Sequence, residues 1–393
     1  KVNISTEAED IELNLEPDKD FSVLEKPNEN DLVQGEIGIP IYKSQELIEE
    51  TVNKKLQGLP DDVCAVLRGP LINNERISSN PWDIKPVENE YLHYEVSEVP
   101  KEIKIYPTKK EDMKILYSTL QFLLFYNIID RAPINCSFGS PTFLIRRKPT
   151  EQGISRAPRL LLDARAVNSK LPGCNSAPML SCYDQLREMC KGAKFLSSVD
   201  LNQMFFALRN SDEVIKSGAV NFTTVFGTFR LLRSIQGGAL SPSFANSVVL
   251  KRIHLDSQDN PSLISSTYCF FDDINLTSGD STSMMEHALN LADLINRIHK
   301  IGFAINLQKS KFCIDMEKES VEVLGLSISK NKITTTDKRR GDVIKHLVEP
   351  KTKVGLQQMI GMLNYLRNLM DSADLRNLAT LSTKLKGNKL AWD

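Results

Sequence analysis

Three carboxylates have the type and the setting needed for metal-assisted chemistry. Asp200 ends the apolar run FLSSVD, and Asp272 and Asp273 stand between the apolar segments CFF and INL. Adjacent carboxylates repel one another, and a bound cation would relieve that repulsion. Converging carboxylates offer the hard oxygen ligands that Mg²⁺ prefers, and two such ions would activate an attacking hydroxyl and hold a pyrophosphate leaving group. For the Asp–Asp pair alone, a plain turn is the competing interpretation, because Asp favours turns.

Several basic residues could bind phosphate, and one glycine could allow the backbone close to a sugar or base. Arg147 and Arg165 each carry a fork that suits the oxygens of a triphosphate, with a solvated surface as the alternative. Gly237 would let the backbone approach a sugar or base closely, with a plain turn as the alternative. Lys309 is one of two lysines in a basic segment and is a candidate phosphate contact or proton donor.

Hydrophobic periodicity predicts the elements that would position these residues. Strands and helices are mixed without a regular βαβα repeat, so the expected fold class is α+β. The predicted strands are 91–99, 140–149, 158–167, 195–200, a hairpin over 223–234, a strand pair over 266–278, 320–329 and 331–336. The predicted helices are 111–130, 181–192, 242–255, 286–303 and several from 337 onward.

Composition excludes several classes of protein. The chain has 393 residues, 41% hydrophobic and 25% charged, and no apolar run of the ~18 residues that a transmembrane helix needs. Its acidic start does not resemble a secretory signal. The seven cysteines form no CxxC pair and the five histidines are far apart, so neither a zinc site nor a thioredoxin motif is expected. Reduced thiols in an intracellular protein are the simplest interpretation.

Charge divides the chain unevenly. Residues 1–100 carry 9 Lys and Arg against 22 Asp and Glu, which leaves 40 basic and 28 acidic residues of the chain's 49 and 50 for the remainder. This asymmetry indicates a polyanionic partner for the basic part. Residues 1–88 are predicted to be an acidic, weakly folded arm with one amphipathic helix, capped by Ser44 and presenting Ile48, Val52, Leu56 and Leu59 on one face.

The motifs that follow the arm occur in a specific order. They are SPTFLIRRK with RLLLDARAVN, FLSSVDLNQMFF, IQGGALSPSFAN, CFFDDI, GFAINLQKSKF, EVLGLSIS and VGLQQMIGMLNYLRNLM. In this order, residues from about 91 to 393 resemble the reverse transcriptases of retroviruses and LTR retrotransposons, and most of all those of gypsy-type elements.

The resemblance implies a right-hand polymerase in which an acidic N-terminal arm precedes fingers, palm and thumb. The implied domains are the arm over 1–88, interleaved fingers and palm over 89–330, a helical thumb over 331–386, and the start of a connection segment over 387–393.

The resemblance also assigns roles to individual residues. The catalytic residues and metal ligands would be Asp200, Asp272 and Asp273, with the Leu201 carbonyl as a further metal ligand. The dNTP pocket would be formed by Arg147, Arg159, Arg165, Phe205, Gln236, Gly237 and Lys309, where Phe205 would exclude a 2′-hydroxyl. The template–primer contacts would be Phe270, Leu324, Gly325, Gln357, Gly361 and Tyr365. Phe270 departs from the family, which usually has Tyr there.

The activity that the resemblance implies is RNA- and DNA-templated DNA polymerisation with two Mg²⁺ ions, or with Mn²⁺ in their place. Its partners would be an RNA template, a DNA primer, RNA–DNA or DNA–DNA duplexes and dNTPs, with no membrane. A homo- or heterodimer, and polyprotein products such as RNase H and integrase, are further implied partners, in the cytoplasm or a virus-like particle. The alternatives are a non-catalytic subunit or nucleic-acid-binding scaffold of the same fold, and a polyprotein segment whose arm serves assembly.

Overall fold

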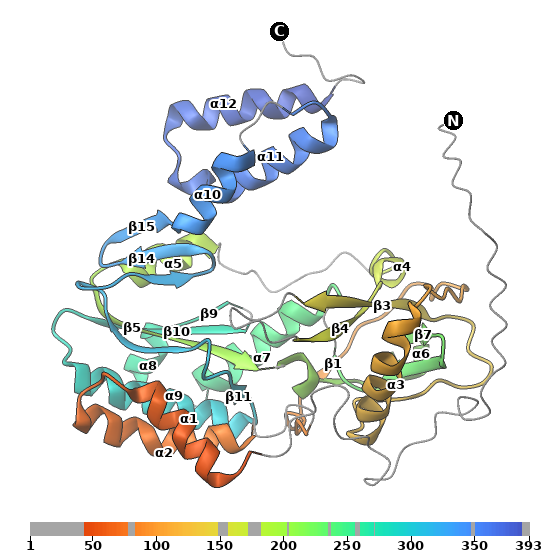
Figure 1. Cartoon of the computed structure of the whole chain (residues 1–393), viewed down its shortest axis with the longest axis horizontal. Coiled ribbons are helices and arrows are strands. Elements are labelled where there is room, and N and C mark those ends of the chain that lie inside the picture. The colour runs from red at the N-terminus through yellow and green to blue at the C-terminus, as the bar shows by residue number, and fades with distance from the viewer. Residues whose placement is uncertain are drawn as a thin grey trace. The chain divides into compact units, whose positions relative to one another are not determined.

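The computed structural model describes two compact units that are interleaved along the chain (Figure 1). The first unit contains residues 91–172 and 209–239, and the second contains residues 40–90, 173–208 and 240–393. The described residues are 43–77, 83–147, 156–171, 182–202, 204–234, 237–255, 260–270, 272–346 and 350–386. Helices and sheets are mixed in both units, which confirms the predicted α+β class.

A five-stranded sheet forms the centre of the first unit. Its strand order is β2 (Ile129–Arg131), β8 (Gly227–Leu231), β7 (Asn221–Thr224), β3 (Ser140–Arg147) and β4 (Arg156–Leu162). β7 and β8 form the predicted hairpin, in which Phe222 lies opposite Phe229 and both rings are fully buried. The remaining elements of this unit are α3 (Lys110–Phe125), α4 (Arg165–Asn168), α6 (Asp212–Ser217) and the short pair β1 (Tyr91–Leu92) and β6 (Arg209–Asn210). The strand predicted over 91–99 is therefore wrong beyond Leu92, because only two of its residues find a partner strand.

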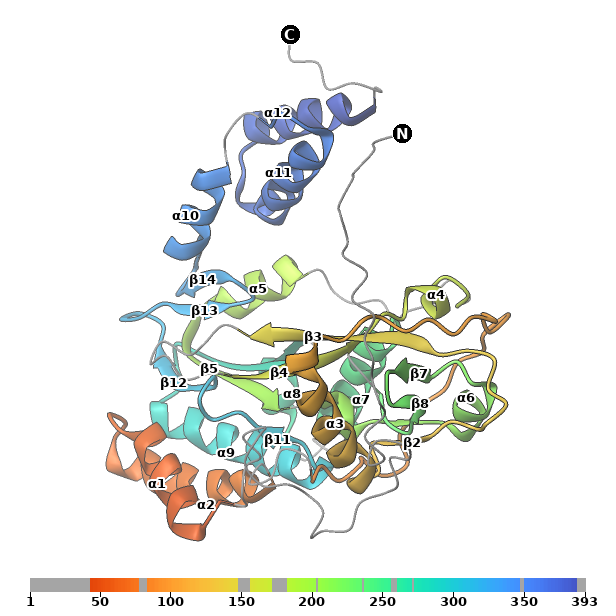
Figure 2. The same ribbon diagram turned by 45° about the vertical axis from the view of Figure 1, so that its right-hand side comes forward.

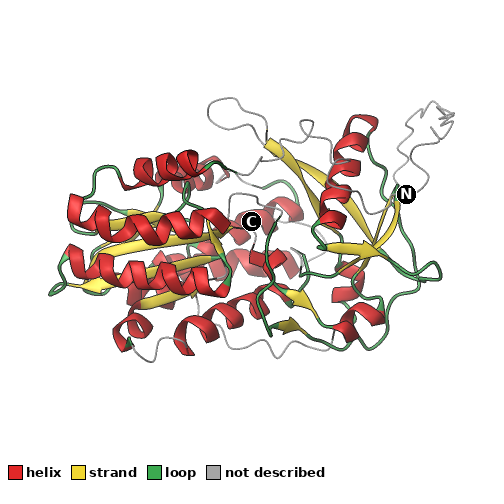
Figure 3. Ribbon diagram, turned by 90° about the horizontal axis from the view of Figure 1, so that it is seen from below, coloured by secondary structure: helices red, strands yellow, loops and turns green. Residues whose placement is uncertain are grey.

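The second unit is built on another sheet, which carries the acidic residues. The strand order is β11 (Ala304–Ile305), β5 (Ala193–Asn202), β10 (Asp273–Gly279) and β9 (Thr267–Phe270), and β12 (Lys311–Asp315) also pairs with β5. Helices α7 (Ser241–Leu255), α8 (Pro261–Ser266) and α9 (Met284–Ile301) pack against these strands (Figure 3). α9 begins with a capping box at Ser283 and ends at Gly302, whose φ of 96° is the left-handed conformation that glycine adopts without strain.

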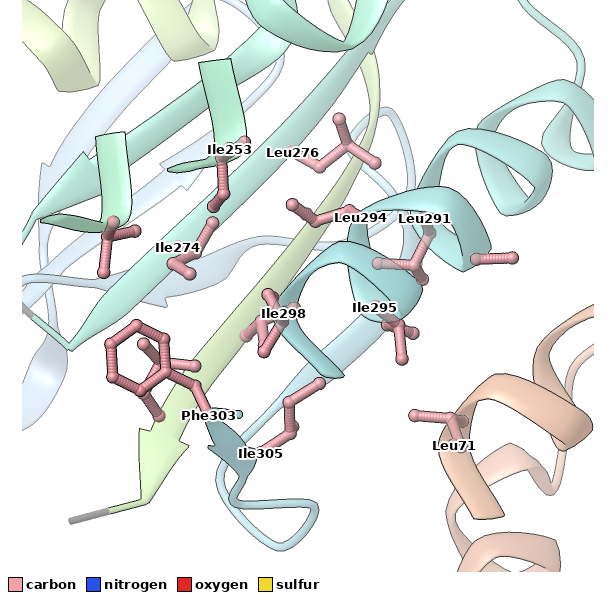
Figure 4. Close-up of a cluster of buried hydrophobic side chains, with 14 of the residues drawn as sticks. Leu71, Ile253, Ile274, Leu276, Leu291, Leu294, Ile295, Ile298, Phe303 and Ile305 are labelled. Carbon is pink, nitrogen blue, oxygen red and sulfur yellow. The ribbon is translucent and has the colours of Figure 1, made fainter. Parts of the chain in front are cut away.

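Two helices near the N-terminus belong to the core of the second unit. α1 (Gln45–Leu56) begins at Ser44, whose hydroxyl accepts from the Leu47 N–H, and it buries Ile48, Val52 and Leu56 as predicted. α2 (Asp61–Ile77) packs on α9 and β11, and Figure 4 shows its Leu71 facing the cluster that includes Ile295 and Ile305.

The prediction of a weakly folded arm over 1–88 is consequently wrong for residues 45–77. The sequence did not indicate α2, because Pro70, Gly69 and two asparagines interrupt its pattern and resemble a loop. Its fully buried Leu67 and Leu71 belong to the same cluster as Val199 and Leu201 of β5. Residues 1–42 lie outside the described part of the chain.

The C-terminal part of the second unit is a small sheet followed by helices (Figure 2). β13 (Val321–Val323), β14 (Leu326–Ser329) and β15 (Lys332–Thr335) pair in that order, and α5 (Cys182–Cys190) packs on β14 and β15. The helices that follow are α10 (Asp337–His346), α11 (Lys353–Tyr365) and α12 (Ser372–Thr383). α11 and α12 lie side by side, joined by a cluster of Leu356, Met359, Ile360 and Leu378.

The described residues bear on two expectations from composition, the absence of a transmembrane helix and the state of the cysteines. Within that part of the chain, no helix combines the length and the apolar character needed to cross a bilayer. The cysteines whose side chains are described are all unpaired thiols, at positions 64, 136, 190, 269 and 313.

Candidate active site

The strand pairing in the second unit brings two of the predicted carboxylates face to face. β5 and β10 run antiparallel, and Asp200 is the direct register partner of Asp273. The turn before β10 is fixed to β5 because the Leu201 N–H donates to the Asp272 carbonyl at 2.8 Å. The hairpin therefore places Asp200 and Asp273 on neighbouring strands, next to the turn that carries Asp272.

Burial makes both facing carboxylates reluctant to ionise. Asp200 is 9% exposed and Asp273 is partly buried, whereas Asp272 lies exposed in the turn. Desolvation, and then the charges of Asp272 and Asp200, raise the pKa of Asp273 to about 6. Desolvation also raises the pKa of Asp200, against the opposing influence of Lys309. A cation at this position would stabilise both carboxylates in their charged form.

Lys309 is the cation that contacts Asp200 directly. Its ammonium lies 3.1 Å from Oδ1 and 2.9 Å from Oδ2. The same segment holds the backbone of Asp200 on both sides, since the Asn306 N–H donates to the Asp200 carbonyl at 2.8 Å and the Asp200 N–H donates to the Ser310 hydroxyl at 3.1 Å. The predicted role of Lys309 at a triphosphate remains a prediction, but its position beside the acidic residues is a feature of the structure.

The donor set fits a divalent cation, though not as the predicted three-carboxylate cage. Among the residues that the structure describes, no three His, Cys, Asp or Glu side chains come close enough together to hold one metal ion. Asp272 lies in an exposed turn, and the Lys309 ammonium contacts both oxygens of Asp200. Two facing carboxylates still suit Mg²⁺, because this ion is commonly held by one or two carboxylates, several waters and substrate phosphates.

The predicted triphosphate arginines lie in the first unit and differ in their surroundings. The Arg165 side chain is 85% exposed, yet its guanidinium donates to both oxygens of Asp163 at 2.7 and 2.6 Å. The Tyr106 hydroxyl also donates to Asp163 at 2.6 Å, and together these bonds hold the pKa of the Asp163 carboxyl well below its usual range. Arg159 is exposed on β4, and only the backbone of Arg147 is described, at the end of β3.

Gly237 adopts a conformation that only glycine tolerates well. Its φ is 108°, and a Cβ at this position would lie 3.2 Å from the Leu162 carbonyl oxygen. The Asn168 amide fixes the segment by donating to the Gly237 carbonyl at 3.0 Å and accepting from the Ala239 N–H at 3.0 Å. The structure thus gives Gly237 a backbone reason to be glycine. Its predicted partner Gln236 lies outside the described residues.

Two aromatic candidates lie on the elements that carry the carboxylates. Phe205 is part of the 3-10 turn Met204–Ala207 after β5, where it is half-buried and packs against the main core of the second unit. Phe270 ends β9 and is the register partner of Asp273. The proposed selection against a 2′-hydroxyl by Phe205 stays a prediction.

The predicted template–primer face of α11 is exposed, but one of its members has another contact. Gln357, Gly361 and Tyr365 are all exposed, and a Cβ at Gly361 would meet nothing within 4 Å. Close helix packing is therefore not the reason for Gly361. The Tyr365 hydroxyl donates to the Leu324 carbonyl, and its ring centroid lies 4.5 Å from the Arg339 guanidinium carbon.

The Leu324–Gly325 turn is shaped to receive Tyr365. Both residues have positive φ, 50° and 72°, and a Cβ on Gly325 would come within 2.9 Å of the Tyr365 hydroxyl oxygen. Tyr365 thus connects α11 to the turn between β13 and β14 in this structure. The template–primer contacts predicted for Tyr365, Leu324 and Gly325 stay predictions.

Sequence reasoning missed the residues that hold the predicted ones in place. They are Asn306 and Ser310 beside Asp200, Asn168 beside Gly237, and Tyr106 beside Asp163. All are uncharged polar residues that make hydrogen bonds to distant parts of the chain. The available signal was that Asn306 and Ser310 lie in the motif GFAINLQKSKF and that Asn168 ends the motif RLLLDARAVN.

Comparison with known proteins relates this geometry to a family. Residues 147–328 match the family model for reverse transcriptase (RNA-dependent DNA polymerase). The Pro-Pol polyprotein of Simian foamy virus type 1 is 25% identical over 241 residues, which cover 60% of this chain and 19% of that protein. The retrovirus-related Pol polyprotein from transposon gypsy of Drosophila melanogaster is 22% identical over 316 residues, which cover 79% of this chain and 28% of that protein. The chain thus spans less than a third of either relative.

Solved structures share the fold. The foamy viral protease-reverse transcriptase in complex with RNA/DNA hybrid matches with a TM-score of 0.66 and 19% identity, over 89% of this chain and 44% of that chain. The dRH form of the same protein in complex with double-stranded DNA matches with a TM-score of 0.67 and 18% identity, over 93% of this chain and 60% of that chain. Both likenesses concern the arrangement of the backbone.

Proposed function

We propose, from the premise that residues 147–328 are a reverse transcriptase domain similar to those of gypsy-like elements, that this chain extends a primer by copying RNA and DNA templates. The observation that carries the proposal is the pairing of Asp200 with Asp273 across neighbouring strands, beside the turn of Asp272. A decayed, non-catalytic scaffold would not need to keep three acidic residues at this place. In this proposal the first unit is the fingers, the sheet of the second unit is the palm, and α10 to α12 are the thumb.

Asp200 and Asp273, with the Leu201 carbonyl, would hold the metal ions, and Asp272 would join them by moving from its turn as the ions bind, since the three described carboxylates are not close enough together in this structure to hold one ion. Two Mg²⁺ ions, or Mn²⁺, would supply charge neutralisation at the attacking hydroxyl and at the leaving pyrophosphate. The protein itself positions the reacting groups and supplies fixed charge, which is the main part of phosphoryl-transfer catalysis.

The cationic side chains would act on the triphosphate. Lys309 already lies beside Asp200, so its ammonium can exchange that carboxylate for a phosphate oxygen as the nucleotide binds. Arg147, Arg159 and Arg165 are assigned to the triphosphate by the resemblance, and Arg165 would have to leave Asp163 to reach it. Gly237 and Gln236 would border the base and sugar.

The proposed partners are an RNA template, a DNA primer, their duplexes and dNTPs. The solved relatives, which contain RNA/DNA hybrid and double-stranded DNA, support the nucleic-acid partners. Assembly as a homo- or heterodimer, association with RNase H and integrase products, and action in the cytoplasm or a virus-like particle are proposed with them. A non-catalytic scaffold would bind the same nucleic acids but would not need Asp272 and Asp273, so we favour the enzyme over the scaffold.

Primer extension tests the proposal. Wild-type protein should extend a DNA primer on RNA and DNA templates only when Mg²⁺ or Mn²⁺ is added, and Asp272→Asn should abolish extension while leaving template binding intact. Asp272 is exposed, so its replacement should leave the fold unchanged. Glu319→Gln, which neutralises another exposed carboxylate of the second unit, is the matched control and should extend normally. Metal-dependent extension by Asp272→Asn at the wild-type rate would refute the assignment.

A further inference from the structure

The side chain of Asn74 makes a buried polar contact between α2 and the sheet that carries Asp200 and Asp273. It is 1% exposed, and its Nδ2 donates to the Phe303 carbonyl at 2.9 Å while its Oδ1 accepts from the Ile305 N–H at 2.7 Å. A side-chain amide offers the same donor and acceptor as a peptide group. Asn74 therefore bonds to the backbone of β11 in the way that a neighbouring strand would.

The position of β11 in the sheet explains why such a partner is needed. β11 is the end strand of the order β11–β5–β10–β9, so no strand among the described residues lies along its other edge. In an antiparallel pair, alternate residues direct their backbone groups to opposite sides. Ala304 and Asn306 face β5, and Phe303 and Ile305 face α2. A buried backbone group without a hydrogen bond lowers the stability of the fold, and Asn74 bonds to both the Phe303 carbonyl and the Ile305 N–H.

β11 leads directly into the segment that surrounds Asp200. The Asn306 N–H donates to the Asp200 carbonyl at 2.8 Å, and the Asn306 carbonyl then accepts from the Lys309 N–H, the Ser310 N–H and the Ser310 hydroxyl. Lys309 and Ser310 in turn contact the carboxylate and the N–H of Asp200. A shift of β11 would therefore move every group of this segment relative to Asp200.

We propose that Asn74 is a positioning residue for the polymerase reaction, holding β11 in the register that presents Asn306, Lys309 and Ser310 to Asp200. The inference rests on the proposed function, and it adds Asn74 to the residues that serve the site, although the family model begins only at residue 147. Figure 4 shows the surroundings of this contact, with Phe303 and Ile305 on the strand and Leu71 on α2 facing the same cluster.

Three variants of the full chain separate positioning from stability. Asn74→Ala removes both bonds to β11. Asn74→Asp can restore them, because burial favours the protonated carboxyl, whose O–H can donate to the Phe303 carbonyl while its other oxygen accepts from the Ile305 N–H. Leu67→Ala is the matched control, since it removes a fully buried side chain from the same helix two turns before the contact.

Two measurements are made on each variant: hydrogen exchange of the 303–310 peptide by mass spectrometry, and the single-turnover rate of nucleotide addition at saturating dNTP and template–primer, normalised to the folded fraction. We expect Asn74→Ala to exchange faster over 303–310 and to lose about tenfold in rate, as is typical when a residue that orients a ligand is removed. Asn74→Asp should recover part of both effects. Leu67→Ala should lower stability while its rate per folded molecule stays at the wild-type value.

The outcomes distinguish this inference from the proposed function. If wild type extends primers but Asn74→Ala keeps the wild-type rate per folded molecule, the positioning role alone is overturned. The same holds if hydrogen exchange over 303–310 is unchanged in Asn74→Ala. A wild-type chain that cannot extend any primer would overturn both. If Asn74→Ala does not fold, Asn74→Ser is measured in its place with the same expected results. Its single hydroxyl is on a shorter side chain than the amide and cannot make both bonds to the backbone.

Discussion

His287 offers the sharpest test of the electrostatics beneath the acidic site. It is fully buried on α9, with Nε2 2.8 Å from the Ser197 hydroxyl of β5 and Nδ1 2.6 Å from the Ser278 hydroxyl of β10. It thus joins the two strands that carry the carboxylates. Burial lowers its pKa from 6.5 to about 4, because the charged ring would lose its hydration.

This shift predicts a loss of stability in acid. As pH falls through about 6.5, the unfolded chain binds a proton at His287 that the folded protein does not bind until the pH is near 4. The free energy of unfolding that depends on a neutral His287 is fully present above pH 6.5 and amounts to roughly 3 kcal/mol. About 2 kcal/mol of it should be lost by pH 5. Asp273 changes the free energy of unfolding in the opposite direction. Its pKa is raised to about 6 in the folded protein, so as the pH falls the folded chain takes up this proton before the unfolded chain does.

A comparison with His287→Gln isolates the histidine. Its amide can hydrogen-bond to the serines but does not titrate, whereas Asp273 titrates in both proteins. Urea unfolding at pH 7.5 and pH 5 should show that wild type loses about 2 kcal/mol more of its free energy of unfolding than His287→Gln does. An equal loss in the two proteins would refute the argument that a neutral, buried His287 joins β5 and β10.

Three further predictions follow from the positions of other residues. Deleting residues 1–88 should unfold the second unit, because it removes two helices from the core; a stable 89–393 chain in thermal melts would contradict this. Phe205→Val should increase ribonucleotide incorporation much more than Phe206→Val in a single-addition assay, and equal effects would contradict a sugar-selecting role. Gly361→Leu should keep or slightly raise thermal stability, since a Cβ there meets nothing and Gly weakens a helix by roughly 1 kcal/mol, while product length per binding event falls if the face contacts the duplex. A Gly361→Leu variant that melts earlier would indicate a structural glycine instead.

The strands and turns around the acidic residues could be predicted from local sequence. β5, β7, β8, β9 and β10 were all expected, because apolar runs interrupted by turn residues are signals that neighbouring residues carry together. The order of motifs then gave Asp200, Asp272 and Asp273 their assignment. α2 was not expected, because Gly69 and Pro70 are residues that disfavour a helix interior, although Val63, Leu67 and Leu71 recur at helical spacing. Its packing on α9 and β11 stabilises the helix despite them.

The sequence by itself determined which residue types are available for chemistry and on which elements they lie. Only the tertiary structure decided which of them meet: Asp200 with Asp273 and Lys309, Tyr365 with Leu324, and Asn74 with the edge of β11. Asn74 and Ile305 are separated by 231 positions, and no local pattern marks a buried amide as the partner of a distant strand. The physical reason is that periodicity records how a segment faces the core, whereas hydrogen bonds and ion pairs depend on which other segment occupies the opposite side.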